Sequence, residues 1–328
     1  MYRFQEERKA EKICYEQDHI AKVLALIRNN FPRYFNDFLS YEAISGITEQ
    51  KIQNIASSLG IENNVKKKTN DKAQSYRNIL AQGIDKFNKD RKKYLDIFDK
   101  ESLDEYSDDP AAFKSKTLRH ECPIINSTLQ NIKAKALDAY RRDFNLANAK
   151  ELLSVVTNLY NFAENYSTNV YDPVTYDNIS DYTKLLFSEL DTESCTVYGV
   201  IGGGIKSHML YKLYPSLFPN RSRMAIWALW YLTDKKSIDC KMDSEFLMID
   251  TKESITQQNY FYPYELFAFY AHQIFQLLKK EAEIMDVSID YGFRYVVVDS
   301  FLTFIADNHI SEINLLMSQI KDSDNGYI

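Results

Sequence analysis

The 328-residue sequence has few of the residues that turn or interrupt a chain, with only 9 Gly and 7 Pro. An all-β sandwich or barrel needs many more turns than these residues supply, so the composition favours long helices. Apolar residues make up 45% of the chain and charged residues 26%, which excludes a disordered or collagen-like protein. We therefore predict a mainly α, multi-helical fold with a few short strands in its C-terminal part. The clearest strand candidate is RYVVVD, residues 294–299.

Cysteine and long apolar runs are scarce as well. The four cysteines lie far apart and form no CxxC pair, so they give no zinc-ligand spacing and indicate reduced thiols. The first thirteen residues, MYRFQEERKAEKI, are charged where a signal peptide would be apolar, and no apolar stretch approaches the roughly 20 residues that span a bilayer. We expect a cytoplasmic protein with no membrane partner. Because no hydrolase triad, HExxH or complete cofactor motif is present, we predict no catalytic residue, metal ligand or cofactor.

The net charge of −6 hides an uneven distribution. Residues 66–93 hold ten Lys or Arg against three Asp, whereas residues 96–109 hold seven acids and one Lys. The basic run fits either a solvated helix face or a surface that follows phosphates. The acidic run ends in SDDP at residues 107–110, the best linker candidate, so we divide the chain into a charged N-terminal helical region, 1–109, and a larger helical domain, 110–328. Within the first region we expect a helix break at Pro32 and a new helix capped by Thr48.

One segment concentrates both glycine and positive charge. Four of the nine glycines lie between Gly199 and Gly204. The forty residues 194–233 contain no Asp or Glu, although the chain average would place about 5.6 acids there, and they include Lys206, Lys212, Arg221, Arg223 and His208. A basic stretch without carboxylates is what a phosphate neighbour requires, since an acid at the contact would offset a cation.

The local pattern predicts an anion site. Gly202 to Gly204 can turn through positive φ and expose backbone N–H groups, and the helix expected from Ile205 points its positive dipole end to the same place, with Lys206 and Ser207 in its first turn. The spacing fits neither a Walker loop nor a dinucleotide fingerprint. We predict that the phosphate backbone of DNA or RNA is bound by six residues: Gly202, Gly204, Lys206, Ser207, Arg221 and Arg223. The alternative is a tight turn between two core helices, with His208 as a structural histidine.

The same segment resembles the helix-hairpin-helix element of the DNA glycosylase superfamily over residues 197–233. The resemblance rests on VIGGGIKS at residues 200–207, the apolar helix that follows, and PSLFP at residues 215–219. It implies that the glycine hairpin gives backbone amides to a DNA phosphate. The family's catalytic Asp follows the Phe-Pro turn, and this chain has Ser222 at that position with no acid before Asp234. The resemblance therefore implies DNA binding without base excision.

Two other classes of function stay open. The first alternative is a Mg2+-dependent nuclease that uses Asp250 and Lys252 at the end of an apolar run, with Asp239 or Asp243 as a second acid. The other is a protein–protein interaction module without catalytic activity, whose aromatic segment 259–278 forms the contact surface. That segment also fits a core helix opened by Pro263. Asp299 ends the predicted strand and is an acid without an assigned role.

Overall fold

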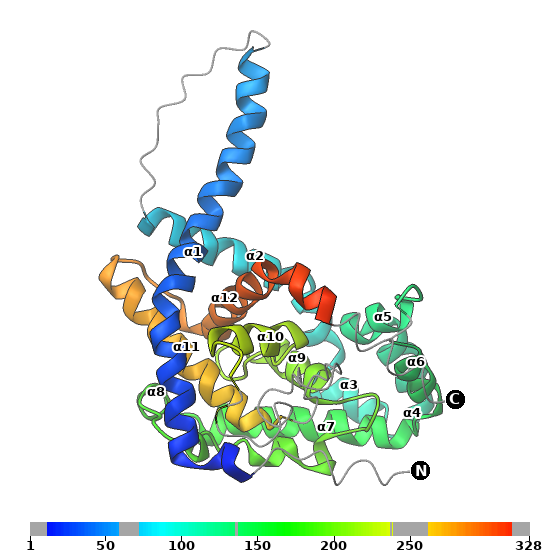
Figure 1. Ribbon diagram of the computed structural model, residues 1–328. Helices are drawn as coiled ribbons and strands as arrows, with labels where there is room; N and C mark the ends of the chain where they lie inside the picture. The colour runs from blue at the N-terminus through cyan, green and yellow to red at the C-terminus, as the bar shows by residue number, and fades with distance from the viewer. Residues whose placement is uncertain (1–11, 59–71, 135–136, 237, 239–261, 317–328) are drawn as a thin grey trace.

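A computed structural model describes residues 12–58, 72–134, 137–236, 238 and 262–316 of the chain (Figure 1). The fold is mainly α, as the composition predicts. The expected few short strands are wrong for this part of the chain, where an isolated antiparallel bridge between Val197 and Ile201 is the nearest approach to a sheet.

The α-helices fall into long helices and short connecting ones. Their bounds are α1 (Gln17–Ser58), α2 (Lys72–Ile97), α3 (Lys100–Glu105), α4 (Pro110–Ala112), α5 (Pro123–Gln130), α6 (Asp138–Leu146), α7 (Ala149–Asn165), α8 (Pro173–Asp177), α9 (Gly203–Leu213), α10 (Arg223–Leu232), α11 (Tyr264–Ile284) and α12 (Arg294–Asn308). A π-helical stretch, Phe113–Glu121, continues α4, and another, Tyr166–Val170, continues α7. Short 3-10 turns are formed by Lys12–Tyr15, Tyr182–Leu185, Ser188–Asp191, Glu193–Cys195 and Tyr291–Phe293.

The segment predicted as a strand, residues 294–299, is the first part of helix α12. Helix α12 packs against α10, α11, α1 and α2, and nearly all of its large apolar side chains are buried. A continuous apolar run has no periodicity that separates a buried strand from a buried helix. Tertiary packing on several sides outweighs the β preference of Val296, Val297 and Val298.

Helix α1 also differs from the expectation, because it continues through both predicted boundaries. Pro32 lies inside it and Thr48 is in its interior. Figure 1 shows the C-terminal part of α1 extending away from the other helices. The predicted linker at residues 107–110 is a short turn, in which Asp109 caps α4 and Pro110 begins it.

Helices from both predicted regions contribute to one apolar core. Helices α1 and α2 pack against α9 to α12, and their buried side chains belong to the same cluster as those of the C-terminal helices. The aromatic segment is largely core: α11 begins directly after Pro263, and Tyr264, Phe267 and Tyr270 are buried. Among the described helices, none is long and apolar enough to cross a membrane.

Candidate functional site

The glycine cluster begins helix α9 without the unusual backbone conformation that the sequence suggested. Gly202 is the N-cap, with φ of −96°, and a Cβ placed on it would meet no atom within 4 Å. Among the described glycines, positive φ occurs at Gly199, three residues before Gly202. Three 3-10 turns precede the glycines, and the nearest earlier α-helix, α8, ends at Asp177. The local order is therefore turn, glycines and helix.

The cations predicted to meet phosphate lie mostly inside the protein. Lys206 is 3% exposed and Arg221 is 4% exposed, whereas Arg223 is exposed at the start of α10. The Nζ of Lys206 donates hydrogen bonds to the Leu190 carbonyl and to Thr196 Oγ1. The predicted residues share one region of the fold, but two of their three charges point inward.

A carboxylate from outside the acid-free segment balances these buried charges. Asp191 accepts the backbone N–H of Tyr264 at 2.9 Å and that of Glu265 at 3.3 Å, which caps helix α11. Burial lowers the pKa of Arg221 to about 10, and the charge of Asp191 opposes this shift. Desolvation also raises the pKa of Asp191, while Lys206 and Arg221 oppose that rise. Asp191 is itself exposed, and its charge favours the charged forms of the two buried cations.

Ser207 and Arg221 fix the loop that follows α9. The Oγ of Ser207 accepts the backbone N–H of Arg221 at 3.0 Å, and the hydroxyl of Tyr264 donates to the carbonyl of Pro219 at 2.9 Å. These two bonds hold the loop on both sides of Asn220. Asn220 is buried and its side chain lines a cavity on the other side of α9.

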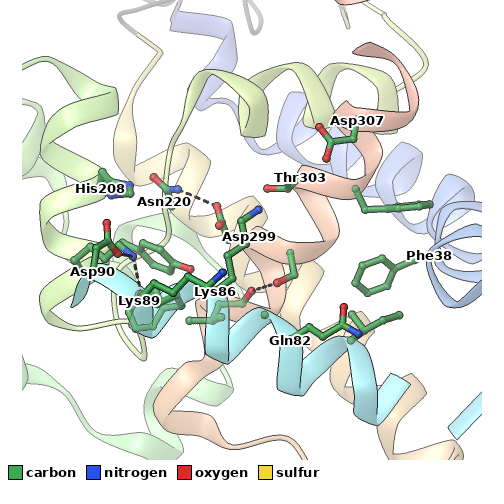
Figure 2. Close-up of a pocket in the computed structure, with 18 residues that line it drawn as sticks. Phe38, Gln82, Lys86, Lys89, Asp90, His208, Asn220, Asp299, Thr303 and Asp307 are labelled. Carbon is green, nitrogen blue, oxygen red and sulfur yellow. Dashed lines mark hydrogen bonds and ion pairs between the residues drawn. The ribbon is translucent and has the colours of Figure 1, made fainter. Parts of the chain in front are cut away.

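This cavity has a volume of about 620 Å³ and lies where α2, α9 and α12 meet (Figure 2). Its apolar wall comes from Phe38 of α1, Phe87 of α2, and Val296 and Phe304 of α12. A cavity of a few hundred Å³ with apolar walls and a few converging polar groups is typical of a small-molecule site.

A row of polar side chains runs along one side of the cavity. Asn220 donates its Nδ2–H to Asp299 Oδ1 at 2.9 Å, and the amide oxygen of Asn220 faces His208 (Figure 2). The hydroxyl of Tyr211 also bonds to Asp299. Burial raises the pKa of Asp299 to about 6, against the opposing effects of the Asn220 bond and the charge of Lys86. Burial lowers the pKa of His208 to about 4, so its ring is neutral at pH 7.

Charged groups of both signs complete the lining. Lys86 and Lys89 are exposed side chains of α2, and Asp307 is exposed on α12. The Nζ of Lys212 is buried, 2.6 Å from Asp90 Oδ1 and 2.8 Å from the carbonyl of Phe87. This ion pair joins α9 to α2. The charges of Lys212 and Asp90 therefore offset each other, which leaves Lys86 and Lys89 as the accessible cations of the lining.

Close contact between α2 and α12 depends on one glycine. Gly83 faces Ser300, and a Cβ at position 83 would lie 2.6 Å from Ser300 Oγ. The Ser300 hydroxyl already donates to the Val296 carbonyl at 2.8 Å. Gly83 therefore lets the two helices approach on the wall of the cavity.

Several sequence candidates meet at this cavity, although none of the six residues from Gly202 to Arg223 that were predicted to bind phosphate is among them. Lys86 and Lys89 belong to the predicted basic run, His208 and Lys212 to the acid-free segment, and Asp299 is the acid without an assigned role. No sequence pattern indicates Gly83 or Asn220 as parts of a site, because only the packing of the helices brings them to it.

The nuclease hypothesis concerns other residues. Asp239, Asp243, Asp250 and Lys252 lie outside the described residues. Within the described ranges, no group of three or more His, Cys, Asp or Glu side chains is arranged to hold a metal ion. The nuclease alternative therefore stays a prediction.

Comparison of the chain with protein-family models, with curated proteins and with solved structures finds no match. The candidate site is thus argued from its own geometry.

Proposed function

We propose that this protein binds nucleotides in the cavity between α2, α9 and α12, either free or as units of a DNA or RNA strand. The observation that carries the proposal is the combination of three kinds of side chain in one space. The cavity of about 620 Å³ has an apolar, partly aromatic wall, a row of hydrogen-bonding groups and two accessible lysines. A nucleotide has a counterpart for each: a flat base, polar base edges and a phosphate.

The phosphate is expected on the α2 side of the cavity. Lys86 and Lys89 are separated by three positions, so they lie on the same face of α2. Asp307 lines the opposite helix and would repel an anion. The base is then expected further in, beside Asn220 and Asp299. In this arrangement the basic run contributes to phosphate binding, while the hydrogen bond between Ser207 and Arg221 supports the loop that carries Asn220.

The experiment compares two double variants of α2 by isothermal titration calorimetry. Lys86→Gln with Lys89→Gln removes the two lysines of the cavity, and Lys92→Gln with Lys93→Gln removes the same charge from exposed positions of the same helix that do not line it. The probes are the 5′-mononucleotides and short single-stranded oligonucleotides. A charge-assisted hydrogen bond contributes about 1.5–3 kcal/mol, so the cavity variant should lose at least about tenfold in affinity.

Salt dependence separates a phosphate contact from an indirect effect. For an oligonucleotide, the slope of log affinity against log salt should fall by about 0.7 for each phosphate contact that is removed. The Lys92/Lys93 variant should keep both the affinity and most of the slope. Absence of nucleotide binding by the unchanged protein, or equal losses in the two double variants, would overturn the proposal.

A further inference from the structure

The carboxylate of Asp299 has hydrogen-bonding capacity left over inside the cavity. An ionised carboxylate has about four acceptor positions. Two donors from the protein are accounted for, the Nδ2–H of Asn220 and the hydroxyl of Tyr211. Asp299 also lines the cavity, so its remaining acceptor positions are available to a ligand. A ligand that fills this space is favoured if it presents donors to Asp299.

The charged neighbours of Asp299 do not change its preference for a ligand that presents hydrogen-bond donors. Lys86 of α2 and Lys212 of α9 act on Asp299 through their charges, and Lys212 is held by Asp90 and the Phe87 carbonyl. His208 has a neutral ring at pH 7. Because burial penalises the charged form of Asp299, a ligand that donates two hydrogen bonds to the carboxylate would relieve part of that penalty.

The nucleobases differ in how many adjacent donors they offer. On its Watson–Crick edge guanine presents N1–H and the N2 amino group side by side. Adenine and cytosine each present one amino group next to an acceptor nitrogen, and uracil and thymine present one N–H between two carbonyls. A carboxylate receives two parallel N–H bonds well, as it does from arginine. Guanine is therefore the base whose edge matches Asp299.

We propose that the cavity selects guanine, with Asp299 accepting the N1–H and N2–H groups of the base. This inference rests on the proposed nucleotide binding and deepens it. Asp299 acts as a specificity-determining residue, and Asn220 positions its carboxylate through the bond to Oδ1. The loop contacts of Ser207 and Arg221 hold Asn220 in turn. The site recognises the same chemical group in a free guanine nucleotide and in a guanine at an accessible position of a single strand.

The test measures the affinities of four nucleotides, 5′-GMP, IMP, AMP and XMP, by calorimetry at pH 7.5. IMP lacks only the 2-amino group, so the unchanged protein should bind it at least about tenfold more weakly than GMP, because one hydrogen bond to a charged acceptor is lost. Asp299→Asn replaces one acceptor by a donor. This variant should lose at least about tenfold in affinity for GMP and should prefer XMP, whose C2 carbonyl accepts from the new amide.

Further measurements keep the outcome clear. Glu283→Gln removes a carboxylate at an exposed position of α11 that does not line the cavity, and it should retain the preference for GMP. Circular dichroism melts establish that each variant is folded, and Asn220→Ala gives an independent route if Asp299→Asn fails to fold, since it should narrow the GMP preference over IMP. Poly(dG)-containing and poly(dA)-containing single strands distinguish a strand from a free nucleotide as the source of the base.

The two proposals fail in different ways. If nucleotides bind with a Lys86/Lys89 dependence but GMP, IMP and AMP bind equally, the guanine inference is wrong and the proposed function stands. If Asp299→Asn keeps the preference for GMP over XMP, the role of Asp299 is wrong. If no nucleotide binds, both are wrong.

Discussion

The effect of Asp191 on the buried cations Lys206 and Arg221 can be tested by replacing its exposed carboxylate. Asp191→Asn removes the negative charge and keeps an oxygen that can accept a backbone N–H at the start of α11. A hydrogen bond to a charged group contributes about 1.5–3 kcal/mol. We expect a loss of about 2 kcal/mol, because Asp191 accepts two backbone N–H groups and its charge favours the buried cations Lys206 and Arg221.

The assay is urea unfolding followed by circular dichroism, with Asp138→Asn as the control. Asp138 forms an ion pair with Arg141 at 2.5 Å, but its side chain is 71% exposed. Exposed pairs contribute about 0–1 kcal/mol, so the control should stay within that range. A loss below about 1 kcal/mol for Asp191→Asn would refute the reasoning that this carboxylate stabilises two buried cations. It would equally weaken the explanation of why a basic, acid-free segment is tolerated in the interior.

The remaining predictions concern pH and two glycines. Burial and Asp191 raise the pKa of Glu265 to about 7, above its usual value, so folding favours the neutral carboxyl. The stability that neutral Glu265 contributes is present at low pH and is lost as the pH rises towards 7. Because Glu265 is partly exposed to solvent, we expect this loss to be about 1–2 kcal/mol relative to Glu265→Gln. Thermal melts of both proteins from pH 5 to 8 measure the loss, and a constant difference between them would contradict the prediction. Gly199 has φ of +77° and its Cβ position lies 2.6 Å from a carboxylate oxygen of Asp143. Gly199→Ala should therefore cost about 1–2 kcal/mol in urea unfolding, whereas Gly202→Ala, with open space around it, should stay within about 0.5 kcal/mol; equal effects would be against this assignment.

The helical class of the fold could be predicted from composition, because the scarcity of Gly and Pro limits the number of turns in the whole chain. The strand prediction at residues 294–299 was wrong for a local reason. A short apolar run contains no polar residues whose spacing would distinguish a helix from a strand. Val296, Val297 and Val298 fit a strand by local preference, yet they lie in a helix that is buried on several sides. Pro32 did not end helix α1 for a similar reason. The tendency of proline to break a helix competes with tertiary packing, which cannot be seen in the local sequence.

The candidate site could be predicted only in pieces. Counting charges along the chain identified the segment that contains His208 and Lys212. In the sequence, Asp299 is only an acid without an assigned role at the end of the predicted strand. The charge count did not show that the Lys206 side chain is buried, because the groups that accept its hydrogen bonds and the charge of Asp191 are set by the fold. The position of Asn220 beside Asp299 depends on contacts between residues 79 positions apart, which no local pattern encodes.

The cavity joins helices that are far apart in the sequence, and this has a consequence for how the protein unfolds. Lys86 on α2 and Asp299 on α12 would both contact the same bound molecule. That molecule would connect an early and a late part of the chain for as long as it stays bound. Such a ligand stabilises the folded state by about 2.7 kcal/mol at a hundred times its dissociation constant. Detachment of α2 would then require release of the ligand first, so occupancy of the cavity would decide whether the two ends of the protein open separately or together.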